Sequence, residues 1–237
     1  LVKLVKADRR MLSKVKFYTG RDQSTVIQVV ATNASAPVGA SEGATGLTRT
    51  NTLAMTTKTL TPSADYSILP ITDYALKFSV VDEGQFMGLF AEAFGDKWDS
   101  EISSSSNTGK CKGIFSAAAT DSANKTTTAS GYPTLKEVYE FAGKVKKMVG
   151  NFELYTSTEV VTALITQDTK DYNFIKEELA KNGTIRGLRV VETNYTTTGS
   201  NGEVIMVASD LARNYAVGLA QDVEIKAFEE VDDLNKY

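Results

Sequence analysis

The sequence contains no histidine and a single cysteine, Cys111, in 237 residues. Histidine is the usual general base near neutral pH and the commonest metal ligand, so its absence argues against Ser-His-Asp or Cys-His catalysis and against Cys/His zinc sites. A single cysteine excludes an intrachain disulfide framework and is typical of a reducing compartment. Because no other catalytic constellation stands out, the sequence predicts a protein that is not an enzyme and that binds no metal or other cofactor.

Long apolar runs and a strong charge imbalance are also missing. No uninterrupted apolar stretch approaches the ~20 residues that span a bilayer, so we expect no membrane-spanning segment. The formal net charge of -3 gives no reason to expect base-specific recognition of nucleic acid. Hydrophobic residues make up 42% of the chain and charged residues 23%, as in chains that fold. The length allows one large domain or two small ones.

Acidic residues gather near the C-terminal end, between Asp222 and Asp233. Paired carboxylates can bind Ca²⁺ or act in acid–base catalysis, but these lack the alternating pattern of a calcium-binding loop. We therefore interpret them as a solvated acidic face. A carboxylate-dependent hydrolase built on this segment is an alternative from another functional class.

The most regular stretch is DEGQFMGLFAEAFGDKWDSEI, residues 82–102, which has the spacing of a helix about 30 Å long. Asp82 and Gln85 have the spacing of a capping box at its start, and a run of serines follows its end. Intervals of three and four residues place its apolar side chains on one stripe: Phe86, Leu89, Phe90, Ala93, Phe94, Trp98 and Ile102. We expect the aromatic members to make the main packing contacts of the helix: Phe86, Phe90, Phe94 and Trp98.

Residues 24–69 change to a β pattern. TVIQVV (25–30) reads as a strand, and so does the stretch from Leu53 through Leu60 to Ile68. The segment between them is rich in Gly, Ala, Ser and Thr, so the simplest structure is a long two-stranded ribbon. Because an isolated two-stranded ribbon is marginally stable in water, we expect it to lie on its own chain or on a neighbour. A disordered loop is the alternative.

Basic and apolar residues alternate through residues 1–20, which contain Arg9 and Arg10. A short amphipathic helix or an arm lying on a partner would both give this pattern, and a membrane-surface segment is a weaker alternative. After the ribbon, Pro70 introduces Ile71–Ser79, which is expected to form a short helix or turn.

The second half of the chain alternates helices and strands. Thr134 and Glu137 form a second capping box, before a helix whose apolar face is predicted to run from Leu135 to Val149 and to stop at Gly150. FELYT (152–156) is a predicted strand, and Thr156 with Glu159 is a predicted capping box for a helix through Leu164. A loop and a short helix then end near Gly183. The remaining predicted strands are LRVVET (188–193), EVIMVA (203–208), NYAVGL (214–219) and VEIKAF (223–228).

Taken in order, four places resemble the major capsid proteins of tailed bacteriophages, which have the Hong Kong 97-like fold. Glu42-Gly43, past the first strand, resembles the family's extended loop, and Pro70-Ile71-Thr72-Asp73 resembles the entry to its spine helix. Gly109 followed by Gly113-Ile114 resembles the junction into its axial domain. FELYTSTEVVTALITQDTKD, GLRVVET and the strand before Ala208-Ser209-Asp210 follow the order of that axial domain.

The resemblance implies an α+β chain divided into five parts. These are an N-terminal arm (1–23), an extended β-ribbon loop (24–69), a peripheral domain with the long spine helix (70–108), an axial domain (109–220) and a C-terminal strand or tail returning toward the peripheral domain (221–237). Family members usually continue past the strand that ends near Phe228, and some lose an N-terminal segment in maturation. A processed start, suggested by Leu1, and a missing C-terminal piece are therefore expectations.

The resemblance implies a shell protein that assembles into hexamers and pentamers around packaged double-stranded DNA, with nonspecific DNA contact. Portal, scaffold and cement proteins are implied partners, and the implied location is the virion, assembled in the host cytoplasm. An encapsulin-like nanocompartment shell shares the fold and is the nearest alternative; a Ser/Thr-rich adhesin or fibre module is a weaker one. We expect contacts between subunits at Glu42, Arg49, Lys58, Arg9 and Arg10. The lysine–asparagine crosslink of some members is not expected, because the ribbon has no lysine before Lys58.

Overall fold

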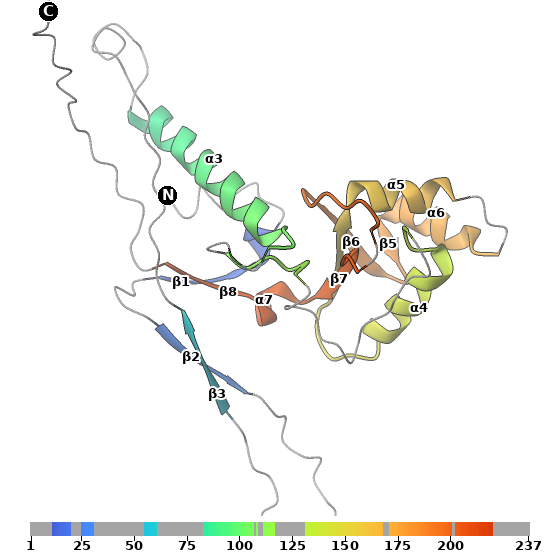
Figure 1. The fold of residues 1–237 in the computed structure, drawn as a ribbon, viewed down its shortest axis with the longest axis horizontal. Helices are drawn as coiled ribbons and strands as arrows, with labels where there is room; N and C mark the ends of the chain where they lie inside the picture. Colours follow the sequence, from blue (N-terminus) through green and yellow to red (C-terminus); the bar gives the residue numbers. More distant parts are fainter. Residues whose placement is uncertain are drawn as a thin grey trace, which may run out of the picture. The chain divides into compact units, whose positions relative to one another are not determined.

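The computed structural model describes residues 11–19, 25–30, 55–60, 83–106, 108, 111–116, 131–167, 171–200 and 202–219 (Figure 1). They fall into two compact units. The smaller consists of Tyr18–Ala64 with Gly218–Asp222, and the larger consists of Leu1–Phe17, Asp65–Val217 and Val223–Tyr237.

A mixed four-stranded sheet lies at the centre of the larger unit, in the order β5-β6-β4-β7. Its strands are β4 (Glu153–Ser157), β5 (Thr184–Ile185), β6 (Leu188–Thr193) and β7 (Met206–Ser209). β4 pairs in parallel with β6, with Leu154 opposite Val190, and antiparallel with β7, with Leu154 opposite Ala208. The predicted strand 188–193 is confirmed, the predicted strand 203–208 is shorter than expected, and the two-residue strand β5 was not predicted.

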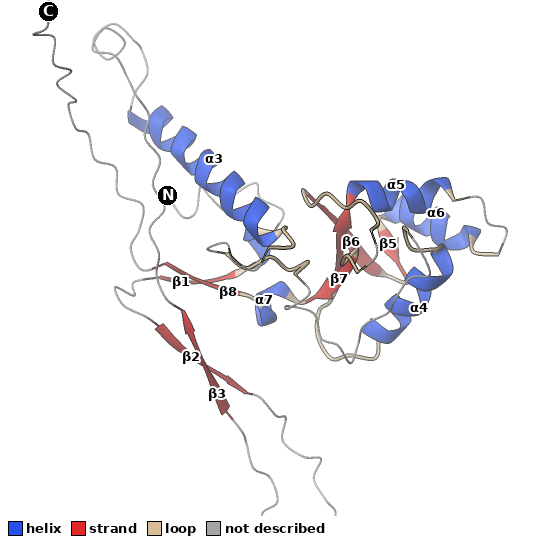
Figure 2. Cartoon of the chain, viewed as in Figure 1, coloured by secondary structure: helices blue, strands red, loops and turns tan. Residues whose placement is uncertain are grey.

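Three helices cover one face of this sheet: α4 (Leu135–Val145), α5 (Thr158–Thr166) and α6 (Asn173–Asn182) (Figure 2). Because side chains alternate along a strand, Leu154 points into the helical face while its neighbour Tyr155 points to the opposite face. The first core cluster is therefore built from Leu154 and the buried stripes of the helices, which include Leu135, Val138, Ala142, Val160, Leu164, Ile175 and Leu179.

The start of α4 agrees with the sequence, but its end does not. The Thr134 hydroxyl accepts a hydrogen bond from the Glu137 amide at 3.3 Å, and the Glu137 carboxylate accepts one from the Thr134 amide at 2.7 Å, which confirms the capping box. The prediction that the helix continues to Val149 is wrong, because α4 ends at Val145 and Val149 is 89% exposed in a bend beyond it. The exposed pair Lys146 and Lys147 offers no apolar face that would hold another helical turn on the core.

The predicted capping box at Thr156 and Glu159 is also wrong, by one residue. Thr156 is fully buried in β4, where its hydroxyl donates to the Ile205 carbonyl at 2.9 Å. Ser157 caps α5 instead, since its hydroxyl accepts from the Val160 amide at 3.4 Å. The strand therefore runs one residue further than FELYT before the chain turns into the helix.

The short helix predicted to end near Gly183 is confirmed as α6, whose C-cap Gly183 is left-handed with φ of 63°. The chain then makes a tight hairpin between β5 and β6, with Arg186 and Gly187 at φ of 52° and 73°. Glu178 on α6 holds this turn: its carboxylate accepts from the Gly187 amide at 2.7 Å, the Thr184 hydroxyl at 2.9 Å and the Arg186 amide at 3.1 Å.

Glu178 makes the stability of this hairpin dependent on pH. Burial opposes ionisation, but the hydrogen bonds and the nearby Lys146 charge outweigh it and hold the pKa of the Glu178 carboxyl below its usual range. A lowered folded-state pKa stabilises the protein above the unfolded value of about 4.3, and this contribution is lost as the pH falls below it. Glu178→Gln is expected to lower the free energy of unfolding by about 1–2 kcal/mol at pH 7, allowing for solvent screening, and by less at pH 3.5.

Urea denaturation at pH 7 and at pH 3.5 measures this difference. Glu177→Gln is the matched control, because Glu177 makes an exposed ion pair with Lys181 at 3.3 Å and should change stability little. Equal losses for the two variants at pH 7, or a loss for Glu178→Gln that does not shrink in acid, would contradict this account.

A second core cluster lies on the opposite face of the sheet. It joins Tyr155, Val191 and Tyr195 to the end of α3 (Glu83–Ile102), to the segment 111–116 and to α7 (Leu211–Asn214). Phe115 stacks on Tyr195 with ring centroids 4.3 Å apart and planes 10° apart. The Tyr195 hydroxyl donates to Glu203 at 2.9 Å, and burial together with this carboxylate raises the pKa of Tyr195 to about 12. Tyr195 is therefore a neutral donor under ordinary conditions.

The long helix is confirmed as α3, but its buried face differs from the predicted stripe. Ala91, Gly95, Asp99 and Ile102 are buried, whereas Leu89 is 55% exposed and Ala93 is exposed. Their spacing of three and four residues is equally helical, so periodicity alone did not choose between the two faces. The capping residue Asp82 lies outside the described residues.

Residues 11–19 do not form the amphipathic helix that was one expectation for residues 1–20. They form a 3₁₀ turn, η1 (Leu12–Lys14), followed by β1 (Lys16–Thr19), which pairs with β8 (Ala216–Leu219). Asn214, predicted to begin this last strand, instead ends α7. Residues 71–79 and 223–228, which carry further predicted elements, lie outside the described residues.

The smaller unit contains the predicted ribbon strands. β2 (Thr25–Val30) and β3 (Met55–Leu60) pair antiparallel, with Thr25 opposite Leu60 and Val30 opposite Met55. This pairing confirms that residues 25–30 and 55–60 form a two-stranded ribbon. The predicted continuation of the second strand to Ile68 lies outside the described residues.

Candidate assembly surfaces

The predicted subunit contacts lie mostly where the structure gives no description. Arg9, Arg10, Glu42 and Arg49 are outside the described residues. Lys58 lies in β3, opposite Ile27, and its side chain is not described. These five residues stay predictions.

The aromatic residues of α3 change in environment along the helix. Trp98 packs against the second core cluster, and its ring lies 5.9 Å from that of Phe94. Phe90 and Phe94 are half-buried, and the side chain of Phe86 is outside the described set. Leu89, in the N-terminal half of α3, is 55% exposed.

A second apolar surface joins α4 to α6, and it was not found from the sequence. Phe174 is 53% exposed, and its ring meets Tyr139 edge to face with centroids 5.5 Å apart. Tyr172 lies 6.3 Å from Tyr139 and 6.2 Å from Phe174. The guanidinium of Arg186 lies over Tyr139 at 4.3 Å. We call Tyr139, Tyr172, Phe174 and Arg186 the aromatic surface.

The aromatic surface has the composition of a protein contact. Tyrosine, phenylalanine and arginine are enriched at protein interfaces, and mutual ring contacts hold these side chains in place before binding. The sequence carried a signal in the aromatic pair Tyr172 and Phe174, but the third ring comes from Tyr139 on another helix. Only the packing of α4 on α6 brings the three together.

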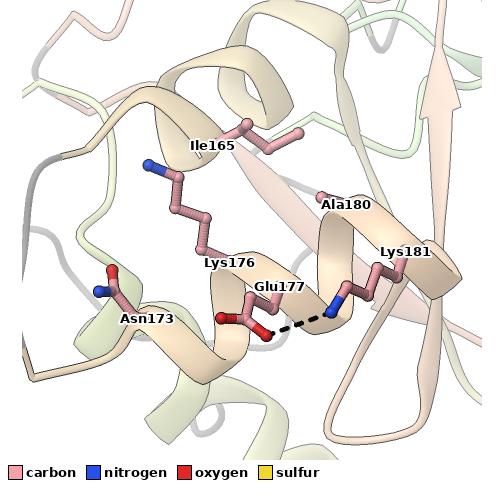
Figure 3. A pocket seen from close by; sticks show the side chains of 6 residues that line it. All are labelled: Ile165, Asn173, Lys176, Glu177, Ala180 and Lys181. Atoms are coloured by element: carbon pink, nitrogen blue, oxygen red, sulfur yellow. Dashed lines mark hydrogen bonds and ion pairs between the residues drawn. The ribbon is translucent and has the colours of Figure 1, made fainter.

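A shallow pocket of about 350 Å³ lies between α5 and α6 (Figure 3). It is lined by Ile165, Asn173, Lys176, Glu177, Ala180 and Lys181. Glu177 forms an ion pair with Lys181, and Lys176 donates a hydrogen bond to the Gln167 carbonyl at 3.4 Å. These charged groups therefore make contacts within and beside α6 and do not point toward a common ligand position. The pocket therefore does not suggest a ligand or catalytic site.

The described residues contain neither a cluster of metal ligands nor a membrane-spanning helix. No group of three or more His, Cys, Asp or Glu side chains there is arranged to hold a metal ion. Within the same part of the chain, no helix has the length and apolar character needed to cross a membrane.

Solved structures with related folds are phage-type capsids. The chain resembles the capsid of a native GTA particle with a TM-score of 0.66 and 14% identity, covering 96% of this chain and 80% of that one. It resembles a chain from Mycobacterium phage Cain with a TM-score of 0.60 and 17% identity, covering 92% and 72%. For Microbacterium phage Oxtober96 the TM-score is 0.56 at 17% identity, covering 91% and 74%. These likenesses define a phage capsid-like fold of mixed helices and strands.

A model of the phage capsid family matches residues 2–236. No curated protein matches the sequence. Because the family model covers nearly the whole chain, the protein belongs to the phage capsid family, as a structural protein of the shell of a tailed phage.

Proposed function

We propose that copies of this chain assemble into hexamers and pentamers of an icosahedral shell that encloses packaged double-stranded DNA. In this proposal the chain has the Hong Kong 97-like division into arm (1–23), ribbon (24–69), peripheral domain (70–108), axial domain (109–220) and C-terminal tail (221–237). It acts by geometry and without catalysis. Its partners are further copies, portal, scaffold and cement proteins and, without base readout, DNA. Assembly takes place in the host cytoplasm.

The observation that carries this proposal is the β2–β3 ribbon. Among the described strands, neither β2 nor β3 pairs with a third strand, so within this part of the chain both outer edges of the ribbon are open. A two-stranded ribbon is marginally stable in water and open edges invite pairing, so a surface beyond the ribbon must stabilise it. In a shell, a neighbouring copy supplies that surface, and the predicted contacts Glu42, Arg49 and Lys58 lie within the same segment.

Electron microscopy of negatively stained native particles, with their absorbance ratio at 260 and 280 nm, tests the proposal. Closed shells of uniform diameter that contain nucleic acid are expected. Shells that are empty or filled with protein would instead favour an encapsulin-like compartment. A chain that stays dispersed under all assembly conditions would overturn assembly itself.

The aromatic surface gives a residue-level prediction for assembly. Phe174→Ser removes a ring whose exposed half, buried against a neighbour, is worth about 1 kcal/mol per contact, which corresponds to a roughly fivefold higher protein concentration for assembly. Light scattering across a concentration series measures this threshold. Because Phe174 is 53% exposed in the single chain, the thermal unfolding of the unassembled protein should change little.

Ala180→Ser is the matched control, since Ala180 is exposed on the same helix and lies outside the aromatic surface. It should leave the assembly threshold unchanged. If Phe174→Ser leaves the protein concentration needed for assembly unchanged, the aromatic surface is not a contact between subunits.

A further inference from the structure

The segment Met11–Val15, which contains η1, is buried more completely than a peripheral arm would be. Met11 and Leu12 are fully buried and Val15 is 3% exposed, all within the second core cluster. Among the described helices and strands, η1 is the element against which α3 packs most. We call Met11–Val15 the clip.

A buried carboxylate on α3 holds one side of the clip. Asp99 is 5% exposed, and its Oδ1 accepts hydrogen bonds from the amides of Met11 and Leu12, both at 3.0 Å. These amides lie at the start of a 3₁₀ turn and have no earlier carbonyl within that turn to pair with. Amide bonds to a carboxylate are stronger than those between neutral groups, and leaving such groups unpaired in a core is costly.

The central strand of the sheet holds the other side of the clip. Lys14 makes an ion pair with Glu153 at the start of β4, and its ammonium lies 5.6 Å from the centre of the Tyr155 ring. The Tyr155 hydroxyl donates to the same Glu153 carboxylate at 2.8 Å. Burial, reinforced by Glu153, raises the pKa of Tyr155 well above its usual value, so Tyr155 stays a neutral donor.

We propose that the clip is a conformational lock that fixes α3 on the four-stranded sheet. It bridges two elements that are far apart in the sequence: Asp99 lies 87 and 88 residues from its amide donors, and Glu153 lies 139 residues from Lys14. Within the described residues, α3 is also attached by its packing in the second core cluster and at the turn 111–116, where Ile114 donates to the Ile102 carbonyl at 2.9 Å. With the clip released, α3 pivots at that turn while the α4–α6 face keeps its own core.

The lock is a property of the single chain and does not depend on the proposed shell. Its test is therefore made on the unassembled full-length protein, by hydrogen exchange followed by mass spectrometry. Asp99→Ala removes the acceptor of both clip amides. Asp99→Asn keeps a carbonyl oxygen that accepts them, and Ser100→Ala changes an exposed neighbour on the same helix.

For Asp99→Ala we expect exchange to become 10- to 100-fold faster in residues 11–17, 98–104 and 111–116, with no change in α5 and α6. Asp99→Asn should have a smaller effect in the same places, and Ser100→Ala none. Lys14→Ala is a milder second variant, for use if Asp99→Ala does not fold. It should also make hydrogen exchange faster in the same three segments. Faster exchange spread equally over α4–α6, or no change at the clip, would overturn the lock.

Discussion

Gly113→Ala is expected to destabilise the protein by about 3 kcal/mol or more. A Cβ atom at this position would lie 2.0 Å from the carbonyl oxygen of Ser104 and 2.5 Å from its carbonyl carbon. These are backbone atoms, so a side-chain rotation cannot relieve the contact. The segment around Gly113 and the segment around Ser104 must therefore move apart. This movement would weaken two backbone hydrogen bonds between the segments, from the Ile114 amide to the Ile102 carbonyl at 2.9 Å and from the Phe115 amide to the Ser104 carbonyl at 3.2 Å.

Gly88→Ala is the matched control for this substitution. Gly88 lies in α3, and a Cβ there meets no atom within 4 Å. Because alanine favours a helix interior over glycine, this variant should be neutral or more stable by up to about 1 kcal/mol. Chemical denaturation of both variants should show a large loss of stability for Gly113→Ala and none for Gly88→Ala. A Gly113→Ala protein as stable as the native one would show that segment 111–116 does not pack against Ser104.

Leu154→Ala is expected to cost about 2–5 kcal/mol of unfolding free energy. Leu154 is fully buried in β4 and points into the core beneath the helices. Its strand is paired on both sides, with Val190 and Ala208 as neighbours in register, so the backbone has little freedom to close the cavity. Thermal and urea denaturation measure the loss.

Leu89→Ala removes the same atoms from a side chain that is 55% exposed, and it serves as the control. Its cost to the single chain should stay within about 0.5 kcal/mol, since little apolar surface returns to water. Similar losses for the two leucine variants would contradict the burial described for Leu154.

Local chemistry made several elements of this fold predictable from the sequence. The capping box of Thr134 and Glu137 places the start of α4, the left-handed Gly183 ends α6, and the β-branched run 188–193 forms β6. Each of these signals acts within a few residues, through a side chain bonding a nearby amide or through a backbone preference. The family resemblance was likewise readable, because it rests on the order of such elements.

Long-range contacts decided what local signals left open. Periodicity permitted a stripe through Leu89 and Ala93, yet α3 buries Asp99, because the distant amides of Met11 and Leu12 pair with its carboxylate. Without these amide donors, burying the Asp99 side chain would be unfavourable, and the side chain would be expected to face solvent. Similarly, the sequence predicted Thr156 as the N-cap of a helix. In the structure Thr156 is buried in the sheet, where it donates to the Ile205 carbonyl, and Ser157 caps the helix.

The sequence by itself therefore determined the class of protein and the order of its longer helices and strands, because these depend on neighbouring residues, whereas η1, β1, β5 and α7 were not predicted. The tertiary structure decided which faces are buried, where Met11–Val15 lies, and that Tyr139, Tyr172 and Phe174 form one surface. Such features depend on residues far apart in the chain, whose meeting is set by the packing of the whole core rather than by any local pattern.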